Sequence, residues 1–271
     1  MTAINNPQTI EFLREHDNFL IINHRRPDGD AVGSAAALCR SLRQMGKAAW
    51  VWKNPETIER YLPYLTGLET ETEPENATLV SVDLATENLL PLNGSGFAGR
   101  IRLSIDHHIS NTHYAENLHW DPEASSACEV LFWMMRENGL PLTKEIALCL
   151  YVGMATDTGC FQFSNADAAA FDAVAQIKKA FPDLPYARLN REFFILKSAG
   201  RILLDSRLMQ NIQLSADGQV ALIYLPYAWM QELQVSSDEV DGVANLPMQI
   251  IGVEIGITCK QQQAGSYRIS L

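Results

Sequence analysis

The sequence predicts an α/β protein, with a doubly wound and mainly parallel sheet in its first domain and a second, smaller mixed α/β domain after it. Short apolar runs rich in β-favouring residues occur at 19–23, 79–83 and 101–106, and they indicate buried strands. Segments with helical periodicity alternate with strands, which is typical of parallel sheets with crossover helices. Each run is closed or followed by an aspartate or a histidine, and ligands bind beyond the carboxyl ends of such strands.

The first half of the chain contains one strongly predicted helix. It spans 31–46, because apolar residues recur at three- to four-residue spacing from Ala35 to Met45. Gly46 is suited to end a helix, since glycine readily adopts a left-handed backbone conformation. We expect a further strand directly after this helix, at 48–53.

The middle of the chain is expected to be helical. Helices are predicted at 126–138, 143–157 and 165–182, and Ser125 or Ser126 caps the first of them. The polar, proline-punctuated stretch 181–185 is the predicted domain boundary.

The remainder of the chain is expected to form a helical segment followed by strands. The helical segment runs from about 187 to 210, and a hairpin of 212–214 and 220–225 follows it around a glycine turn. Strands are predicted at 250–259 and 266–271. The division is therefore a first domain at 1–185, a helical linker at 186–210 and a small domain at 211–271.

Composition limits the class of partner. The chain of 271 residues has a formal net charge of −11, which argues against a tight grip on long duplex nucleic acid. No apolar run is long enough for a membrane span, and the N-terminus does not have the pattern of a secretory signal. The five cysteines are scattered without a CxxC pair, which indicates reduced thiols: Cys39, Cys128, Cys149, Cys160 and Cys259. We expect a cytoplasmic protein without membrane partners, and a homodimer is compatible with the sequence.

Histidines and aspartates gather where strands should end. The run 24–30 contains His24, Asp28 and Asp30, and its Pro27 and Gly29 favour a tight turn that lets the three side chains point the same way. The other candidates are Asp83, Asp106, His107, His108 and Asp157. Imidazole and carboxylate ligands without thiolate suit a pair of divalent cations, with Mn²⁺ preferred over Mg²⁺ or Co²⁺.

These motifs, in this order, resemble those of the DHH/DHHA1 phosphoesterase family, a RecJ-like superfamily, and among its members the NrnA-like bifunctional oligoribonucleases and PAP phosphatases. His24, Asp28 and Asp30 are similar to its first motif, Asp83 to the second, residues 106–108 to the third and Asp157 to the fourth. The resemblance covers most of the chain. It implies a DHH catalytic domain at 1–185 and a DHHA1-like substrate-binding domain at 211–271.

The resemblance also implies a role for each motif residue. Two Mn²⁺ ions would be held by six side chains: His24, Asp28, Asp30, Asp83, His107 and Asp157. His108 would face the scissile phosphate, and Asp106 would orient the histidines. We also expect substrate contacts from Arg25 and Arg26 in the metal-binding loop, and from Ser125 and Ser126 at a helix N-terminus, which favours anions.

The C-terminal domain departs from the family pattern. The stretch 240–254 is similar to the opening of a DHHA1 domain, which in the family continues into a glycine-rich GGH element. This sequence ends at Leu271 before such an element. We therefore expect a partial, apparently truncated DHHA1-like domain.

The expected function is metal-assisted phosphoester hydrolysis. The preferred substrates are short oligonucleotides, cleaved as by an exonuclease, and a 3′,5′-nucleoside bisphosphate (pAp). Within the same chemistry, the alternatives are linear or cyclic dinucleotides (pApA, cyclic di-AMP) and inorganic pyrophosphate. A protein that binds nucleotides without catalysis is the alternative from another class.

Overall fold

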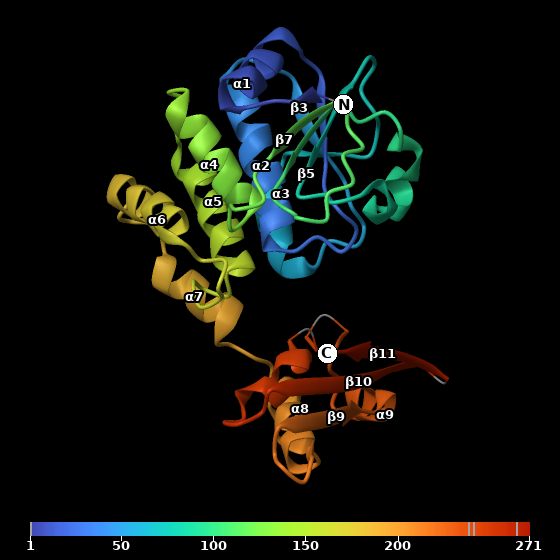
Figure 1. Ribbon diagram of the computed structural model, residues 1–271. Helices are drawn as coiled ribbons and strands as arrows, with labels where there is room; N and C mark the ends of the chain where they lie inside the picture. Colours follow the sequence, from blue (N-terminus) through green and yellow to red (C-terminus); the bar gives the residue numbers. More distant parts are fainter. Residues whose placement is uncertain (1, 238, 241, 264) are drawn as a thin grey trace. The chain divides into compact units, whose positions relative to one another are not determined.

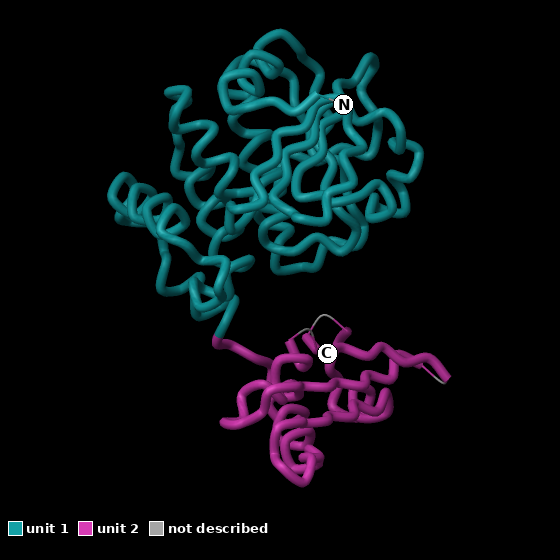
Figure 2. Tube along the Cα trace, viewed as in Figure 1, with its two compact units in different colours: residues 1–194 teal, residues 195–271 magenta. Residues whose placement is uncertain are grey.

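The computed structural model describes residues 2–237, 239–240, 242–263 and 265–271. These residues form two compact units, one at 1–194 and the other at 195–271 (Figure 2). Unit 1 carries all the histidines and aspartates that the sequence places at a metal site, so its fold is described first.

The predicted α/β class is confirmed by the seven-stranded sheet of unit 1. The strand order is β1-β7-β6-β5-β2-β3-β4, and every neighbouring pair is parallel. Figure 1 labels β3, β5 and β7 of this sheet. The strands are β1 (Thr2–Ala3), β2 (Phe19–Ile22), β3 (Ala49–Trp52), β4 (Glu69–Thr70), β5 (Thr78–Val82), β6 (Leu103–Asp106) and β7 (Asn117–Trp120).

Both faces of this sheet are covered. On one face, Phe19, Val80 and Ile105 pack into a core with the longer helices. On the other, Leu20 and Leu79 pack beneath the loops and short helices between β5 and β6. The helices of unit 1 are α1 (Asn6–Glu15), α2 (Gly29–Gln44), η1 (Glu59–Tyr61), α3 (Leu62–Leu65), η2 (Glu87–Leu89), η3 (Leu92–Phe97), α4 (Ala127–Glu137), α5 (Lys144–Asp157), α6 (Ala168–Ala180) and α7 (Tyr186–Phe194).

Helices α2 and α5 approach each other closely because glycines line their contact. A Cβ atom at Gly33 would lie 2.5 Å from the carbonyl oxygen of Cys149. A Cβ atom at Gly153 would collide with Cys128 Sγ and would lie 2.7 Å from Asp30 Oδ1. The missing side chains therefore allow the start of α2, with Asp30, to lie near the end of α5, with Asp157.

Several predicted boundaries differ from the structure. Helix α2 begins at Gly29, two residues before its predicted start, because Asp28 caps it by accepting hydrogen bonds from the backbone of Asp30 and Ala31. Helix α6 begins at Ala168 with Asp167 as its cap, not near Asn165. The helical segment predicted from about 187 to 210 consists of two helices, α7 in unit 1 and α8 in unit 2.

Unit 2 is the smaller mixed α/β part that the sequence predicts. Its sheet has the order β11-β10-β9-β8, with β9 and β10 parallel and the other neighbours antiparallel. The elements are α8 (Ala199–Gln210), β8 (Gln213–Leu214), β9 (Val220–Leu225), α9 (Tyr227–Glu232), η4 (Val243–Asn245), η5 (Pro247–Gln249), β10 (Ile255–Gln263) and β11 (Ser266–Ser270).

The predicted hairpin of β8 and β9 is confirmed. Strand β10 begins at Ile255, and not at residue 250, because a 3₁₀ turn occupies Pro247–Gln249 and Gly252 adopts a left-handed conformation. All five cysteines are free, as expected. Among the described residues, no helix combines the length and apolar character that membrane crossing requires.

Candidate metal centre

The carboxyl ends of three adjacent strands bring the predicted ligands together. His24 follows β2, Asp83 follows β5, and His107 follows β6. These strands are neighbours in the order β6-β5-β2, so residues just beyond their ends meet at one edge of the sheet. Asp28 and Asp30 at the start of α2 and Asp157 at the end of α5 reach the same edge. Together with His108, these side chains form three groups that could hold a cation.

The first group is His24, Asp28 and Asp83. His24 Nε2 lies 3.9 Å from Asp28 Oδ1 and 3.6 Å from Asp83 Oδ2. The other ring nitrogen, Nδ1, lies 2.7 Å from the backbone oxygen of Arg25. Because a carbonyl can only accept, Nδ1 donates in this contact, and Nε2 is the ring nitrogen that faces the two carboxylates.

The second group is Asp30, His107 and Asp157. His107 Nε2 lies 4.0 Å from Asp30 Oδ2, 3.6 Å from Asp157 Oδ2 and 3.5 Å from Asp83 Oδ1. Its Nδ1 lies 3.2 Å from the backbone oxygen of Ala124. The ring is therefore oriented as in His24, with Nε2 directed at the carboxylates.

Asp83 lies between the two groups and faces both. Its Oδ2 is directed at His24 and its Oδ1 at His107. Its backbone has a φ of 52°, a left-handed conformation that aspartate tolerates better than most residues. Asp83 Oδ1 is buried and has no hydrogen-bond partner among the described residues. A buried carboxylate oxygen without a hydrogen bond is costly, and a cation bound by both groups would satisfy it.

The distances within the groups also fit cation binding. Imidazole nitrogens and carboxylate oxygens lie 3.5–4.0 Å apart, which exceeds ordinary hydrogen-bond length. The donor atoms of each group lie within 4.8 Å of one another. Side-chain atoms that converge in this way without bonding to each other could share a cation. A third group, Asp83, His107 and His108, meets the same criterion.

Asp30 is held by the N-terminus of α4. It is fully buried, and its two oxygens accept hydrogen bonds from the backbone of Ala127 at 2.7 Å and of Cys128 at 2.9 Å. The first backbone N–H groups of a helix attract anions, so α4 fixes this carboxylate beside His107.

The hydroxyl groups of Ser125 and Ser126, for which we predicted a substrate contact, are not accessible in this structure. Both serines are fully buried. Ser125 Oγ donates to Glu129 Oε2 at 2.6 Å, and Ser126 Oγ accepts from the backbone of Glu129 as the cap of α4. Ser126 therefore caps α4, Ser125 is bonded to the Glu129 side chain, and the anion at this helix end is Asp30. The contact of the two serines with substrate stays a prediction.

Asp106 orients one histidine of the motif and not both. Its Oδ1 accepts a hydrogen bond from His108 Nδ1 at 2.8 Å, and its Oδ2 accepts one from Asn111 Nδ2 at 2.6 Å. His107 uses the backbone oxygen of Ala124 instead. The expectation that Asp106 orients both histidines is corrected in this respect, because its two oxygens are occupied by His108 and Asn111.

Neighbouring charges shift the pKa of several of these groups. Burial alone lowers the pKa of His24, but Asp83 and Asp28 outweigh it and raise the value to about 9. Burial likewise opposes the carboxylates around His107, which raise its pKa to about 10. Burial is the main cause that raises the pKa of Asp157 to about 7. An imidazole with a raised pKa is protonated near neutral pH in the metal-free protein, so a bound cation has to displace that proton.

Arg25 and Arg26 lie in the loop between His24 and Asp28 and are exposed. Arg26 has a left-handed backbone with a φ of 52°, and its Nε lies 3.7 Å from Glu56 Oε1. Both side chains are accessible at the edge of the candidate centre. Their contact with substrate stays a prediction.

Asn111 and Asn165 are site residues that the sequence did not identify. Asn165 Nδ2 donates to the backbone oxygens of Ser125 at 3.1 Å and Asp157 at 3.2 Å, and so joins the start of α4 to the end of α5. Both asparagines lie in polar loops, where asparagine is common. No local signal distinguishes them from ordinary turn residues.

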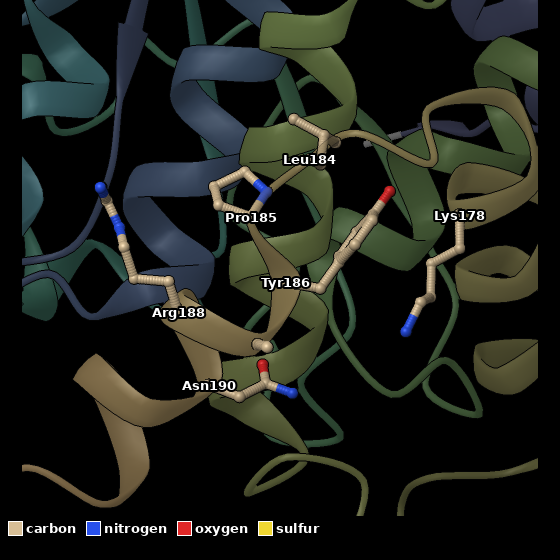
Figure 3. A pocket seen from close by; sticks show the side chains of 7 residues that line it. Lys178, Leu184, Pro185, Tyr186, Arg188 and Asn190 are labelled. Atoms are coloured by element: carbon tan, nitrogen blue, oxygen red, sulfur yellow. The ribbon is translucent and has the colours of Figure 1, made fainter.

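A separate pocket of about 480 Å³ lies where α6 and α7 meet (Figure 3). Lys178 Nζ lies over the ring of Tyr186, 4.8 Å from its centroid, and Asn190 Oδ1 accepts a hydrogen bond from Tyr151 at 2.7 Å. None of the residues that line this pocket belongs to the three ligand groups.

Comparison with known proteins identifies relatives of this chain. Residues 18–154 match the profile of a family described as the DHH family, N-terminal domain. The "Probable bifunctional oligoribonuclease and PAP phosphatase NrnA" of Streptococcus mutans serotype c is 26% identical over 266 residues, which cover 96% of this chain and 82% of the relative. The "Bifunctional oligoribonuclease and PAP phosphatase NrnA" of Bacillus subtilis is 24% identical over 258 residues, covering 91% and 78%.

The fold is similar to that of a solved structure. An exopolyphosphatase-related protein from Bacteroides fragilis superposes with a TM-score of 0.81 at 22% sequence identity, over 97% of this chain and 82% of that one. The likeness extends over both units and concerns the fold.

Proposed function

The chain belongs to the DHH family, and on this premise we propose that it is a metal-dependent phosphoesterase that hydrolyses short oligonucleotides and 3′,5′-nucleoside bisphosphate. The observation that carries the proposal is the position of Asp83. It belongs to one ligand group, faces His107 of the other, and has a buried Oδ1 without a hydrogen-bond partner among the described residues. Coordination of phosphate by paired cations is the chemistry that such a bridging carboxylate serves.

We propose that one cation is held by His24, Asp28 and Asp83, and the other by Asp30, Asp83, His107 and Asp157. Nitrogen and oxygen ligands without thiolate favour Mn²⁺, and Mg²⁺ or Co²⁺ would be weaker substitutes. When bound, the pair would neutralise phosphate charge and lower the pKa of water.

The chain's own residues would orient substrate and ligands. The backbone oxygens of Arg25 and Ala124 keep the Nδ1 proton on His24 and His107, so that Nε2 of each ring is free to act as a ligand. Asp106 accepts the Nδ1 proton of His108, which leaves the Nε2 side of that ring available for a phosphate oxygen.

We further propose that His108 donates a proton to the substrate. The hydrogen bond to Asp106 raises the pKa of His108, burial opposes this rise and Asp83 adds to it, and the net shift favours the protonated ring. Donation of this proton would neutralise charge on the phosphate or on the leaving oxygen during attack by water. Arg25 and Arg26 are the exposed cations that would contact further phosphates.

The choice of substrate rests on the relatives. Two of them are named bifunctional oligoribonuclease and PAP phosphatase, and they are similar to this chain over more than nine-tenths of its length. Short nucleotide substrates also agree with a net charge of −11, which disfavours long nucleic acid. Linear or cyclic dinucleotides remain the alternative within the same chemistry.

The test measures hydrolysis of pAp, pApA, cyclic di-AMP and a pentanucleotide in the presence of Mn²⁺. We compare the wild-type protein with Asp83→Asn, because asparagine also tolerates the left-handed backbone at this position but removes the charge. The matched control is Asp121→Ala. Asp121 directly follows β7, next to β6 in the sheet, and its side chain caps a turn outside the ligand groups.

We expect turnover of pAp and the pentanucleotide by the wild type and by Asp121→Ala, and a loss of at least about 100-fold in Asp83→Asn. Turnover of only pApA or cyclic di-AMP would favour the dinucleotide alternative. Nucleotide binding without turnover in any variant would overturn the proposal and favour a non-catalytic binding protein.

A further inference from the structure

An exposed aromatic ring lies on the segment that follows Asp157. Phe163 is 53% exposed, although a large apolar side chain gains free energy from burial. Its ring packs over Gly159, where an added Cβ atom would lie 2.5–2.7 Å from three ring carbons. Gly159 comes two residues after Asp157, so the ring lies beside the end of α5.

The segment that carries Phe163 has a constrained backbone. Gly159, Cys160 and Phe161 have φ values of 56°, 58° and 63°, and successive left-handed residues persist only where their surroundings fix them. The buried hydroxyl of Thr158 donates to Met154 O at 2.6 Å and accepts from the backbone of Phe161 at 3.0 Å. The backbone of Phe163 donates to Thr158 O at 3.0 Å.

Two further contacts anchor this segment on either side of Phe163. Before it, the ring of Phe161 packs against Phe171, with centroids 5.6 Å apart, and lies near Tyr151. After it, Asn165 bonds to the backbone oxygen of Asp157 at 3.2 Å. Phe161 is thus packed against aromatic neighbours, whereas Phe163 is presented to solvent from a backbone tied to a candidate metal ligand.

We propose that Phe163 stacks on a nucleobase of the substrate whose phosphate is bound at the metal centre. This inference rests on the proposed function and specifies the substrate class of that site. A fixed aromatic face is suited to a base, since every base has a π face and stacking needs no precise hydrogen-bond match. In an acidic protein, such stacking can supply affinity that basic side chains supply elsewhere.

The test compares substrates that differ only in their bases. pApA and an analogue with the same phosphates but without either base are hydrolysed by the wild type and by Phe163→Ala, Phe163→Leu and Phe163→Tyr. Leucine keeps an apolar side chain but removes the aromatic face, whereas tyrosine keeps the ring. Gln162→Ala is the neighbouring control, because the Gln162 side chain is exposed and bonds only to the backbone oxygen of Gly159 among the contacts described.

We expect kcat/KM on pApA to fall about 5- to 100-fold in Phe163→Ala and Phe163→Leu, which is the usual range for loss of one stacked base. Phe163→Tyr and Gln162→Ala should stay within about twofold of the wild type. The base-free analogue should be hydrolysed equally by all five proteins. The ratio of kcat/KM on pApA to kcat/KM on this analogue should therefore be smaller in Phe163→Ala and Phe163→Leu than in the wild type.

A binding measurement provides a second readout. A phosphorothioate dinucleotide that resists hydrolysis and carries 2-aminopurine should lose fluorescence on binding to the wild type and to Phe163→Tyr, but not to Phe163→Ala. Stacking would be refuted if Phe163→Ala lost kcat/KM equally on pApA and on the base-free analogue, or if it still quenched the fluorescence. Either result would leave the proposed function intact. A wild type that hydrolyses neither compound, and neither pAp nor the pentanucleotide, would refute the proposed function, and the quenching experiment alone would then decide the stacking.

Discussion

At the scale of single residues, Asp106 illustrates how a buried carboxylate can orient a neighbouring side chain without belonging to any of the three ligand groups. It is fully buried, and its two oxygens are occupied by His108 and Asn111. Its contact with His108 fixes the orientation of that ring, whereas the ring of His107 is oriented by the backbone of Ala124. The structure therefore separates the residue that we propose to act on substrate from the residues that we propose to hold cations.

Substitution of Asp106 should consequently affect turnover more than metal content. In Asp106→Asn, the amide cannot hold a protonated His108 as the carboxylate does, and we expect kcat to fall about 10- to 100-fold, as for other orienting partners. The amount of Mn²⁺ bound per protein should stay at the wild-type level when it is measured by elemental analysis. A variant that loses Mn²⁺ in proportion to activity would show that Asp106 instead supports the ligands.

His119 on β7 provides a pH prediction that does not involve metal. Burial is the main cause that lowers its pKa to about 4, and its Nδ1 lies 3.0 Å from Thr9 Oγ1. In the unfolded chain the pKa is near 6.5. Between about pH 6.5 and pH 4, His119 is therefore protonated in the unfolded state and neutral in the folded state. The free energy of unfolding should decrease as pH falls through this window.

The expected loss from His119 alone reaches at most about 3 kcal/mol at pH 4. Chemical denaturation of the wild type and of His119→Phe between pH 4 and pH 7 measures it. Between pH 7 and pH 4, the free energy of unfolding of the wild type should fall by up to about 3 kcal/mol more than that of His119→Phe, which lacks the titrating group. A constant difference for His119→Phe would contradict the prediction.

At the scale of elements, the close approach of α2 and α5 depends on glycine. In Gly153→Ala the new methyl group would overlap Cys128 Sγ and crowd Asp30, so α5 has to move away from α2 and α4. We expect unit 1 to lose about 1–3 kcal/mol of stability, the usual cost of overpacking a core. Urea denaturation measures this loss, and Gly96→Ala is the control because a Cβ atom there meets nothing within 4 Å. If Gly153→Ala were as stable as Gly96→Ala, the close approach of α2 and α5 would not be needed for stability.

The sequence predicts the longer elements of the sheet and its helices, because these have a clear hydrophobic period. β2, β5 and α5 lie close to their expected ranges. The two-residue strands β1 and β4 are too short to have any period, and their pairing depends on partners that are distant in sequence. Helix α1 was also not predicted, but for a different reason. Asn5 and Gln8 form a capping box at its start, and this pattern is visible in the sequence.

The candidate site was predictable where it depends on the ends of elements. His24, Asp83 and His107 follow neighbouring parallel strands, and parallel strands bring such residues together. The orienting contacts were not predictable. The backbone oxygen of Ala124, which faces His107, and the side chain of Asn165, which bonds to Asp157, reach the site only through the packing of α4 and α5.

At the scale of the whole molecule, cation binding should stabilise the folded chain. The ligand groups join α2, α5 and three strand ends, which are close together only when unit 1 is folded. Ligands that bind the folded state alone add stability by mass action, about 2.7 kcal/mol for one site at 100 times its dissociation constant. We therefore expect Tm to rise when Mn²⁺ is added to chelator-treated protein. Asp83→Asn should lose most of this rise, and an unchanged Tm in the wild type would contradict the ligand assignment.

The carboxylate of Asp30 at the first turn of α4 has a consequence for how an anionic substrate can be captured. Backbone N–H groups at the start of a helix often bind a phosphate directly. Here those of Ala127 and Cys128 are occupied by the Asp30 side chain of the same protein. An incoming phosphate would therefore depend on bound cations at this edge of the sheet, because the helix N–H groups are already occupied. Removal of the metal by a chelator should thus weaken substrate binding as well as stop hydrolysis, so both steps would depend on the metal concentration.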